Sequence, residues 1–459
     1  MGNKSSTFSS RSIDPHGKPR GFKKVLDKKI FQEKIDQQNA LSAIRKKLVG
    51  KTLNYKEIYS IMDQIAKQKF GDVLTTYFAA SGYSQGFSSQ ELYYLTKAMI
   101  ETGEKLHFKG IVADKHSIGG VPGNRTTLIV VPIIAACGFL IPKSSSRAIT
   151  TSGTADDMEI LAPVILSKEK ILKIIKKIKA CIVWGGNFNI APADDVIINV
   201  EKELMFESFD KIIVSIMSKK IAFGSTHVVI DLPYGHTLKV VHLKDAEILK
   251  GKFEYIARKF NIKIRVLIHR TDQPVGRGMG PVLETKDALK VLEQAPDRPY
   301  DLEIRSITLA GNLLELCLKD SPRKLQEHVR NTYGNCTGWA KEILQKGLAL
   351  KKMKEIIFEQ GGNQNVESSK LTPGKFTYEI KTKKDCVIKN IDSKNLTILT
   401  RTLGAPSQKG AGVYLDKKEG ERAKKGNVIC TLYSEKVYNL KQGKKTIRQF
   451  PIFDFQSNL

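Results

Sequence analysis

Two short segments of the chain combine glycine, hydroxyl and basic side chains in a way that suits an anion. The first is Asp-Lys-His-Ser-Ile-Gly-Gly at residues 114–120, and the second spans residues 144–154. Adjacent glycines allow backbone N–H groups to approach a ligand closely, and Lys115 adds a positive charge beside the hydroxyl of Ser117. The second segment consists mostly of serine, threonine, glycine and Arg147, which offer many donors to phosphate oxygens. Together the segments predict a phosphate site.

The neighbouring sequence indicates how the first segment is positioned. It follows an apolar run at residues 110–113 and precedes an apolar stretch, Thr126–Ala136, that predicts a helix. The apolar run ends in Asp-Lys-His-Ser and then a glycine pair, and we expect a strand that opens into a flexible turn at these glycines. The turn would lie near the N-terminus of the helix, where anions are favoured. Either segment alone is typical of an ordinary loop, but the place of His116 between a lysine and a serine favours an acid–base or ligand-orienting role.

Length and cysteine usage restrict the class of protein. The chain has 459 residues, which exceeds the usual size of one domain, so we expect two or three domains. Its six cysteines include no Cys-x-x-Cys pair, which argues against a zinc module or a disulfide framework and fits a cytoplasmic protein without a metal site. The longest apolar run, residues 128–142, is shorter than the roughly 20 residues of a membrane span. We expect neither a membrane segment nor a signal peptide.

The chain is strongly basic, with a formal net charge of +28. Residues 1–40 are rich in lysine and arginine, and we expect them to form a basic tail without fixed structure. The remaining positive charge is spread along the sequence, without the interleaved aromatic and basic residues of a known nucleic-acid fold. We therefore do not expect a nucleic acid as partner. The charge would instead raise the local concentration of small anionic substrates.

Changes in sequence pattern predict a multidomain protein that combines α/β and α+β parts. Residues 41–105 have helical spacing and predict a small helical domain, joined by a second helical stretch at about 190–220. Residues 106–360 alternate short β-branched runs with amphipathic segments, which is typical of an α/β domain. Residues 370–459 carry short strand runs with glycine and lysine turns, which indicate a separate C-terminal α+β module.

These motifs resemble the thymidine phosphorylase family of nucleoside phosphorylases. The resemblance covers roughly residue 41 to the C-terminus and rests on these segments: 115–120, 146–147, 153–159, 191–194 and 215–220. It implies a helical domain that faces a larger α/β domain across a cleft, with phosphate on the α/β side, and a homodimer. The implied reaction is phosphorolysis, in which inorganic phosphate cleaves an N-glycosidic bond to give a free base and a pentose 1-phosphate. No cofactor besides phosphate is implied.

The resemblance also implies roles for individual residues. His116 matches the histidine that contacts and protonates the departing base, and Ser215 and Lys219 match a pair that hydrogen-bonds the polar edge of the base. A donor that stabilises the departing charge is typically worth about 10²–10³ in rate. The positions expected to hold phosphate are Lys115, Ser117, Gly120, Thr127, Ser145 and Thr154.

One position departs from the pattern of the thymidine-cleaving enzymes. Those enzymes carry an arginine about fifteen residues before the serine of the base-binding pair, and this chain has Val200 there. The sequence is also similar to a branch whose archaeal members phosphorolyse AMP, in which an aspartate eight residues before that serine donates a proton, and Glu207 holds this spacing. The other positions that match the nucleotide pocket of this branch are Ser146, Arg147, Ala148, Ile149, Thr150, Thr151 and Lys239. Thymidine-like nucleosides and nucleoside monophosphates both stay open as substrates.

Two other classes of function stay open at this point. The same fold resembles anthranilate phosphoribosyltransferase, although the Gly-Thr-Gly-Gly-Asp loop of that enzyme is absent. A non-catalytic protein that binds phosphate or RNA is the other alternative, and strong salt-dependent RNA binding without turnover would favour it. The intact set of Lys115, His116, Ser117 and Lys219 favours an enzyme.

Overall fold

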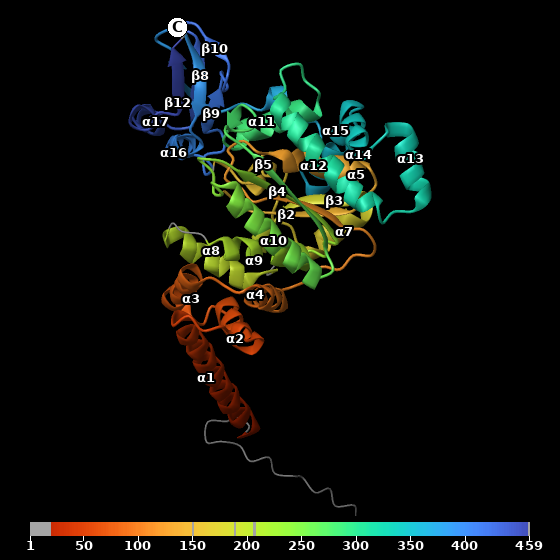
Figure 1. Cartoon of the computed structure of the whole chain (residues 1–459), viewed down its shortest axis with the longest axis vertical. Coiled ribbons are helices and arrows are strands. Elements are labelled where there is room, and N and C mark those ends of the chain that lie inside the picture. Colours follow the sequence, from red (N-terminus) through yellow and green to blue (C-terminus); the bar gives the residue numbers. More distant parts are fainter. Residues whose placement is uncertain (1–19, 149–150, 188–189, 205–207, 458–459) are drawn as a thin grey trace, which may run out of the picture. The chain divides into compact units, whose positions relative to one another are not determined.

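The structure is a computed structural model that describes residues 20–148, 151–187, 190–204 and 208–457 (Figure 1). The chain divides into two compact units. The first joins the chain up to Thr102 with Pro192–Asp210, and the second contains Gly103–Ala191 and Lys211–Leu459. The second piece of the helical unit is therefore shorter than the expected stretch at about 190–220, because residues 211–220 pack within the larger unit.

The first unit is helical, as its spacing predicts. Its helices are α1 (Arg20–Leu48), α2 (Tyr55–Ala66), α3 (Gly71–Gln85), α4 (Ser89–Glu101) and α8 (Pro192–Leu204). Asn54 and Ser88 form capping boxes at the starts of α2 and α4, which satisfy backbone N–H groups that the helix leaves without partners. The expectation of a tail without fixed structure is wrong for residues 20–40, which belong to α1. Residues 1–19 lie outside the described residues.

The larger unit contains an α/β domain built on parallel strands (Figure 1). One sheet has the order β1-β4-β5, and a second pairs β2 with β3. A parallel bridge between Val112 and Leu140 links the two sheets beside β1 and β2. The carboxyl ends of these strands therefore share one edge, where open α/β sheets bind their ligands. The strands are β1 (Ala113–Ser117), β2 (Ile141–Ser145), β3 (Ala180–Trp184), β4 (His227–Tyr234) and β5 (Lys263–Arg270).

Helix α5 forms the centre of the apolar core of this domain. It spans Thr126–Ala136, which confirms the predicted helix, and its side chains are buried on all sides. It packs against α12 and α15 as well as the strands. The other helices of the domain are α6 (Thr154–Met158), α7 (Lys168–Ile178), the 3-10 turn η1 (Gly185–Asn187), α9 (Phe209–Ala222), α10 (Leu243–Lys259), α11 (Pro281–Leu292), α12 (Tyr300–Leu318), α13 (Arg323–Tyr333), α14 (Cys336–Gln345) and α15 (Leu348–Gln360).

The segment at residues 114–120 begins in a strand and ends in the predicted glycine turn, although the strand starts later than the apolar run at residues 110–113. Residues 114–117 belong to β1 and pair with residues 228–231 of β4, so their backbone groups are satisfied by the sheet. Buried polar partners allow charged side chains in this interior strand. The turn follows at Gly119 and Gly120, whose φ angles of 87° and 91° are readily adopted only by glycine.

The predicted C-terminal α+β module is present, but it shares a sheet with the α/β domain. The two-residue strand β6 (Gly278–Met279) pairs with β9, and Met279 packs in the core of the module. Arg277 donates to two carbonyls of the module and to Glu421. A short 3-10 turn, η2 (Ser368–Lys370), precedes the module, whose elements are β7 (Phe376–Lys381), β8 (Cys386–Ile391), α16 (Ser393–Leu403), β9 (Gly412–Leu415), β10 (Arg422–Ala423), β11 (Val428–Ser434), α17 (Val437–Gln449) and β12 (Phe453–Ser457).

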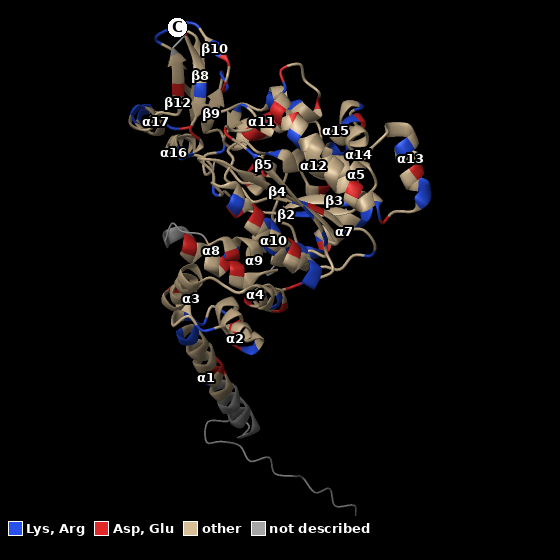
Figure 2. Cartoon of the chain, viewed as in Figure 1, with Lys and Arg blue, Asp and Glu red and all other residues tan. Residues whose placement is uncertain are grey.

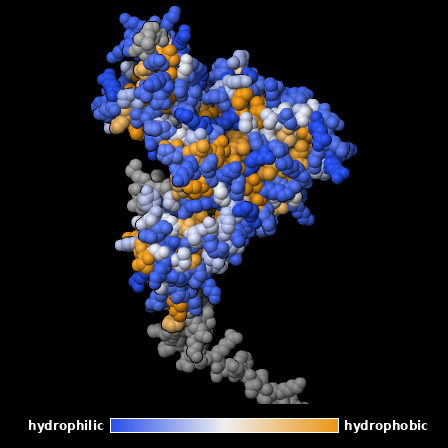
Figure 3. Space-filling view, viewed as in Figure 1, coloured by the Kyte–Doolittle hydropathy of each residue, from blue (hydrophilic) through white to orange (hydrophobic). Residues whose placement is uncertain are grey.

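Basic and acidic side chains are mixed on the face of the molecule that Figure 2 shows. Figure 2 shows lysine and arginine interspersed with aspartate and glutamate over most of the described elements. The visible face of the C-terminal module is mainly hydrophilic (Figure 3), since its apolar side chains pack in an internal core. Among the described helices, none is long and apolar enough to cross a membrane. The described residues also contain no group of three or more potential metal ligands.

Candidate active site

Lys115 is the centre of the predicted phosphate site. Its side chain is 1% exposed, and its Nζ lies 2.6 Å from Ser117 Oγ and 2.6 Å from Thr126 Oγ1. Thr127 Oγ1 is 3.4 Å away, so three hydroxyls surround the ammonium group at the start of α5. Burial lowers the pKa of Lys115 to about 8, although the carboxylate of Asp231 acts in the opposite direction. The structure thus brings together Lys115, Ser117 and Thr127, and adds Thr126, which sequence reasoning did not find.

Asp231 of β4, which lies opposite Ser117 in the sheet, organises the surroundings of Lys115. Burial opposes its ionisation, but Arg305 and Lys115 outweigh that effect and hold the pKa of Asp231 well below its usual range. Its carboxylate is completely buried. Four side chains contact it: Ser117 Oγ at 2.5 Å, Asn124 Nδ2 at 3.0 Å, Arg305 Nη2 at 3.1 Å and His269 Nε2 at 3.4 Å. Sequence reasoning missed this residue, although a carboxylate within a buried apolar strand was a usable signal.

His116 follows Lys115 in β1 and is half-buried. Burial, together with the charges of Lys220, Lys143, Lys115 and Lys219, lowers the pKa of His116 well below its usual value. The imidazole is therefore neutral near pH 7, with one ring N–H donor and one ring acceptor. A neutral ring can donate a hydrogen bond to a departing base, but it carries no second proton to release.

Helix α9 carries the predicted base-binding pair. Ser215 and Lys219 are one helical turn apart and both are half-buried. The charges of Lys219 and Lys115 both lower the pKa of His116. One residue of the predicted base-binding pair and one predicted phosphate-binding residue therefore lie near the same imidazole. Glu207 lies outside the described residues.

The second predicted phosphate-binding segment, residues 144–154, is held in place by ion pairs of Arg147. Arg147 Nη1 donates to Asp156 at 3.0 Å and its Nη2 donates to Glu159 at 2.8 Å, while its guanidinium lies 5.3 Å from the ring centroid of Trp184. Lys409 of the C-terminal module reaches Glu159 at 2.8 Å, a contact that the sequence did not predict. Arg147 is thus held by carboxylates of its own segment. This arrangement fixes the loop rather than leaving the guanidinium free for a ligand.

Other predicted residues of this segment have more varied surroundings. Ser145 Oγ donates to Val183 O at 2.9 Å, and Thr154 is the first residue of α6. Ser146 is exposed and Ala148 N donates to Asp156 at 2.8 Å. Thr151 is buried and bonds to Glu284. Ile149 and Thr150 lie outside the described residues.

The glycine turn brings two further predicted residues together. A Cβ atom added to Gly120 would lie 3.2 Å from Cγ of Lys239, so the stem of this lysine runs along the turn. Lys239 is therefore placed beside Gly120, as expected if both belong to one pocket.

The loop leaves no room for a side chain at Gly153. A Cβ atom there would come within 2.5 Å of the backbone of Arg147 and of the carbonyl of Ser146. We expect Gly153→Ala to force the loop open and to cost about 1–3 kcal/mol of unfolding free energy, with weaker phosphate binding. Gly251→Ala is the matched control, because no atom lies within 4 Å in α10 and alanine favours a helix by about 0.5–1 kcal/mol. The unfolding free energies would be measured in urea, and equal values for the two variants would contradict this account.

Comparison with known proteins places this geometry in a family. A model described as "Glycosyl transferase family, a/b domain" matches residues 109–350, and one described as its helical bundle domain matches residues 41–103. A model of the pyrimidine nucleoside phosphorylase C-terminal domain matches residues 387–450. The chain belongs to the thymidine phosphorylase family of glycosyl transferases. It is accordingly an enzyme of the glycosyltransferase class.

Curated members of the family extend the comparison. The chain is 43% identical over 397 residues to the AMP phosphorylase of Thermofilum pendens. The aligned region covers 86% of this chain and 74% of that protein. It is 41% identical over 398 residues, with the same coverage, to a protein of Legionella pneumophila (strain Paris) named "Putative thymidine phosphorylase". The crystal structure of anthranilate phosphoribosyltransferase from Thermus thermophilus shares the fold, with a TM-score of 0.56 and 16% identity over 69% of this chain and 99% of that one.

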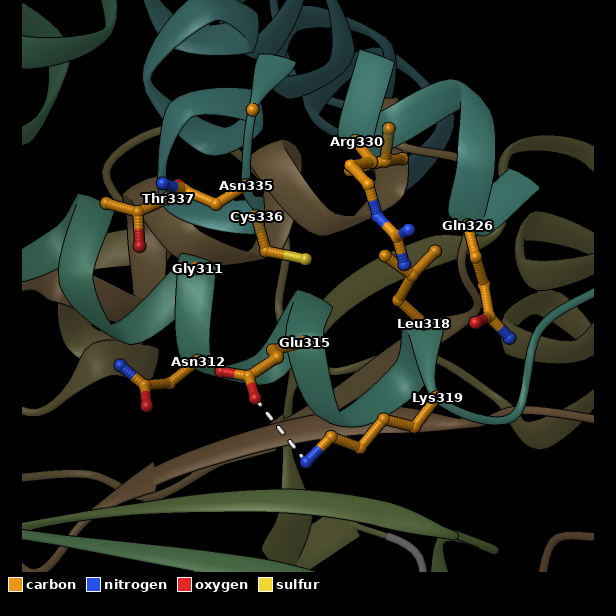
Figure 4. Close-up of a pocket in the computed structure, with 12 residues that line it drawn as sticks. Gly311, Asn312, Glu315, Leu318, Lys319, Gln326, Arg330, Asn335, Cys336 and Thr337 are labelled. Carbon is orange, nitrogen blue, oxygen red and sulfur yellow. Dashed lines mark ion pairs between the residues drawn. The ribbon is translucent and has the colours of Figure 1, made fainter. Parts of the chain in front are cut away.

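A surface depression elsewhere in this glycosyltransferase has no part in the site described above. It has a volume of about 410 Å³ and is lined by residues of α12, α13 and α14 (Figure 4). Glu315 in its wall pairs with Lys319 at 3.4 Å and with Arg265 at 2.8 Å. None of the predicted site residues lines this depression. Lys115, Ser117 and Asp231 meet instead between β1, β4 and the N-terminus of α5.

Proposed function

We propose that this protein catalyses phosphorolysis of the N-glycosidic bond of a nucleoside-type substrate. An oxygen of inorganic phosphate forms a bond to the anomeric carbon, and the base departs with the electron pair of the C–N bond. The products are a free base and a ribose or deoxyribose 1-phosphate. Inorganic phosphate is the co-substrate, and the proposal includes no metal or further cofactor.

The buried ammonium group of Lys115 carries this proposal. In the described part of the chain its hydrogen-bond partners are the uncharged hydroxyls of Ser117, Thr126 and Thr127. The nearby carboxylate of Asp231 is shared with Arg305, so one negative charge faces two cations. A buried charge is costly unless an opposite charge compensates it. A phosphate at the N-terminus of α5 would supply that charge and would also meet the positive end of the helix.

His116 and residues of α9 are proposed to contact the departing base. The departing base carries negative charge in the transition state, and donors placed where that charge develops lower the barrier. We assign to neutral His116 the role of hydrogen-bond donor, and to Ser215 and Lys219 the polar edge of the base. Glu207 is proposed as the proton donor, on the strength of its spacing before Ser215.

A nucleoside 5′-monophosphate is the substrate that we favour. Lys239 runs along the glycine turn at Gly120, which adds a cation where a second phosphate group could be held. Val200 stands where thymidine-cleaving enzymes carry an arginine, so a pyrimidine carbonyl has lost one expected partner. A thymidine-like nucleoside is the second candidate, favoured by the retained Ser215 and Lys219.

Release of free base from a panel of substrates would test the proposal. Thymidine, uridine, adenosine, AMP, CMP and UMP would each be incubated with and without phosphate. Phosphate-dependent turnover of the monophosphates alone would support our assignment, and turnover of thymidine or uridine would select the second candidate. RNA binding without turnover of any substrate would contradict both.

Assembly as a homodimer in the cytoplasm is part of the proposal and rests on the family resemblance. Light scattering of the purified protein would test the assembly: a mass near twice the 51.3 kDa of the chain is expected. A monomer would contradict it.

The pKa of Lys115 predicts how turnover depends on pH. The ammonium form holds phosphate, so kcat/KM for phosphate is expected to fall as pH rises through about 8 in the free enzyme. Bound phosphate favours the charged lysine, and the decline of kcat is therefore expected at higher pH than that of kcat/KM. Initial rates between pH 6 and 10, with a check that the enzyme stays folded, would measure both. A profile of kcat/KM that stays flat to pH 10 would contradict the role of Lys115.

A further inference from the structure

A second buried ionic cluster lies directly beside the phosphate site. Asp114 Oδ2 accepts hydrogen bonds from Lys220 Nζ at 2.7 Å and from Ser225 Oγ at 3.1 Å. Its Oδ1 lies 3.4 Å from Lys143 Nζ. Asp114, Lys143 and Lys220 are each at most 3% exposed. One carboxylate of β1 therefore joins a lysine of β2 to a lysine of α9.

Stability alone is a poor explanation for this cluster. A buried ion pair often contributes no more to stability than apolar residues of similar volume, because burial removes the hydration of both charges. Here two buried lysines share one carboxylate, so Asp114 cannot compensate two ammonium groups. Burial, with repulsion from Lys220, lowers the pKa of Lys143 well below its usual value even though Asp114 opposes the change. The arrangement is costly and calls for another role.

The members of the cluster are adjacent to the residues that the reaction uses. Asp114 precedes Lys115 and His116 in β1 and accepts a hydrogen bond from the backbone N–H of Lys115 at 2.7 Å. Lys220 follows Lys219 in α9. The ion pair between Asp114 and Lys220 thus links the strand of the phosphate site to the helix of the base-binding pair.

The same cluster bears on the charge state of His116. The basic groups that act on this imidazole are Lys220 and Lys219 of α9, Lys143 of β2 and Lys115 of its own strand. The ion pair with Asp114 therefore fixes the position of the Lys220 amino group, which acts on the ring. This charge favours the neutral imidazole, which is the form we assign to the hydrogen-bond donor.

We propose that Asp114 and Lys220 are positioning residues for phosphorolysis, whose ion pair holds α9 against β1 and so sets Lys219 in place relative to His116. This inference rests on the proposed function. Loss of the pair removes a contact that fixes α9 relative to the strand. Displacements of about 1 Å at reacting groups can lower a rate about 10²-fold. The pair itself contacts neither phosphate nor base.

Replacement of Lys220 tests the inference in the full-length enzyme. Lys220→Met removes the charge and the tether, and we expect kcat to fall about tenfold to a hundredfold with a smaller change in KM for phosphate. The pKa of His116, followed by NMR and assigned by comparison with His116→Asn, is expected to rise because Lys220 no longer repels the protonated ring. Lys220→Arg retains the charge and is expected to keep the pKa of His116 low and to recover part of kcat.

Lys418→Met is the matched control. It also removes a buried lysine paired with a carboxylate, at 3.0 Å from Asp301, but at the junction with the C-terminal module. We expect lower thermal stability with unchanged kcat and an unchanged His116 titration. If Lys220→Met behaves like Lys418→Met in all three measurements, the cluster is only structural and the inference is overturned.

Two further outcomes are distinguishable. If Lys220→Met does not fold, Ser225→Ala removes one donor from Asp114 more gently: a severalfold loss of kcat at unchanged Tm supports the inference, and wild-type kcat overturns it. If the wild-type enzyme shows no phosphorolysis, the proposed function fails. The His116 titration then still decides whether Lys220 controls that ring.

Discussion

Lys115→Ala is expected to lower kcat/KM for phosphorolysis by about 10²–10³-fold or more, since a preorganised donor to developing charge is typically worth that factor. The variant leaves the hydroxyls of Ser117, Thr126 and Thr127 without the ammonium group that they surround. Phosphate should then no longer raise the Tm of the protein, because the anion has lost its buried positive partner. Steady-state rates at several phosphate concentrations and thermal unfolding with and without phosphate would measure both effects.

Lys177→Ala is a suitable control for the loss of one positive charge. Its ammonium group pairs with Glu359 on an exposed surface of α7 and α15, where such pairs contribute little. Its kcat/KM and its response to phosphate should equal those of the wild type. Near-normal phosphorolysis by Lys115→Ala would remove this residue from the phosphate site.

Asp231→Asn is expected to have the largest effect on stability. The substitution removes the negative charge that Arg305 and Lys115 face in the interior, and two buried cations then lack a compensating carboxylate. Breaking a buried ion pair from one side typically costs about 3–5 kcal/mol. Activity should fall as well, because Asp231 accepts the hydrogen bond of Ser117 at 2.5 Å and so orients that hydroxyl.

Unfolding in urea would measure this loss, and saturating phosphate should restore part of it because the anion compensates the same cations. Asp320→Asn is the control, since Asp320 also pairs with a histidine and a lysine but its side chain is 29% exposed. We expect a cost of about 1 kcal/mol or less there. Equal losses in the two variants would contradict the role given to Asp231.

Local sequence pattern predicted the helix at residues 126–136 and the general division into helical, α/β and C-terminal parts. It also selected Lys115 and Ser117, and the family resemblance added Thr127; the structure places both hydroxyls within 3.4 Å of the Lys115 ammonium group. Polar residues 114–117 are unusual in a buried strand, and they form one because Asp231, Lys220 and the hydroxyls of α5 satisfy them.

The prediction for residues 20–40 was wrong. Its high charge indicated a tail without fixed structure, yet the chain from Arg20 to Leu48 is helical. Later in the same helix, Ala43 and Ile44 are buried against the neighbouring helices of the first unit. Packing at one end of a helix can stabilise a charged stretch that composition alone places among disordered sequences.

The family and the enzyme class followed from sequence alone, because short motifs retain the residue types and spacing of the family. The partners that tune those residues came only from the tertiary structure. Asp231 and Arg305 lie far from Lys115 in the chain, and Lys220 meets Asp114 across more than a hundred residues. Such contacts are created when parallel strands and their helices assemble, so no local pattern records them, and they decide which groups are charged in the site.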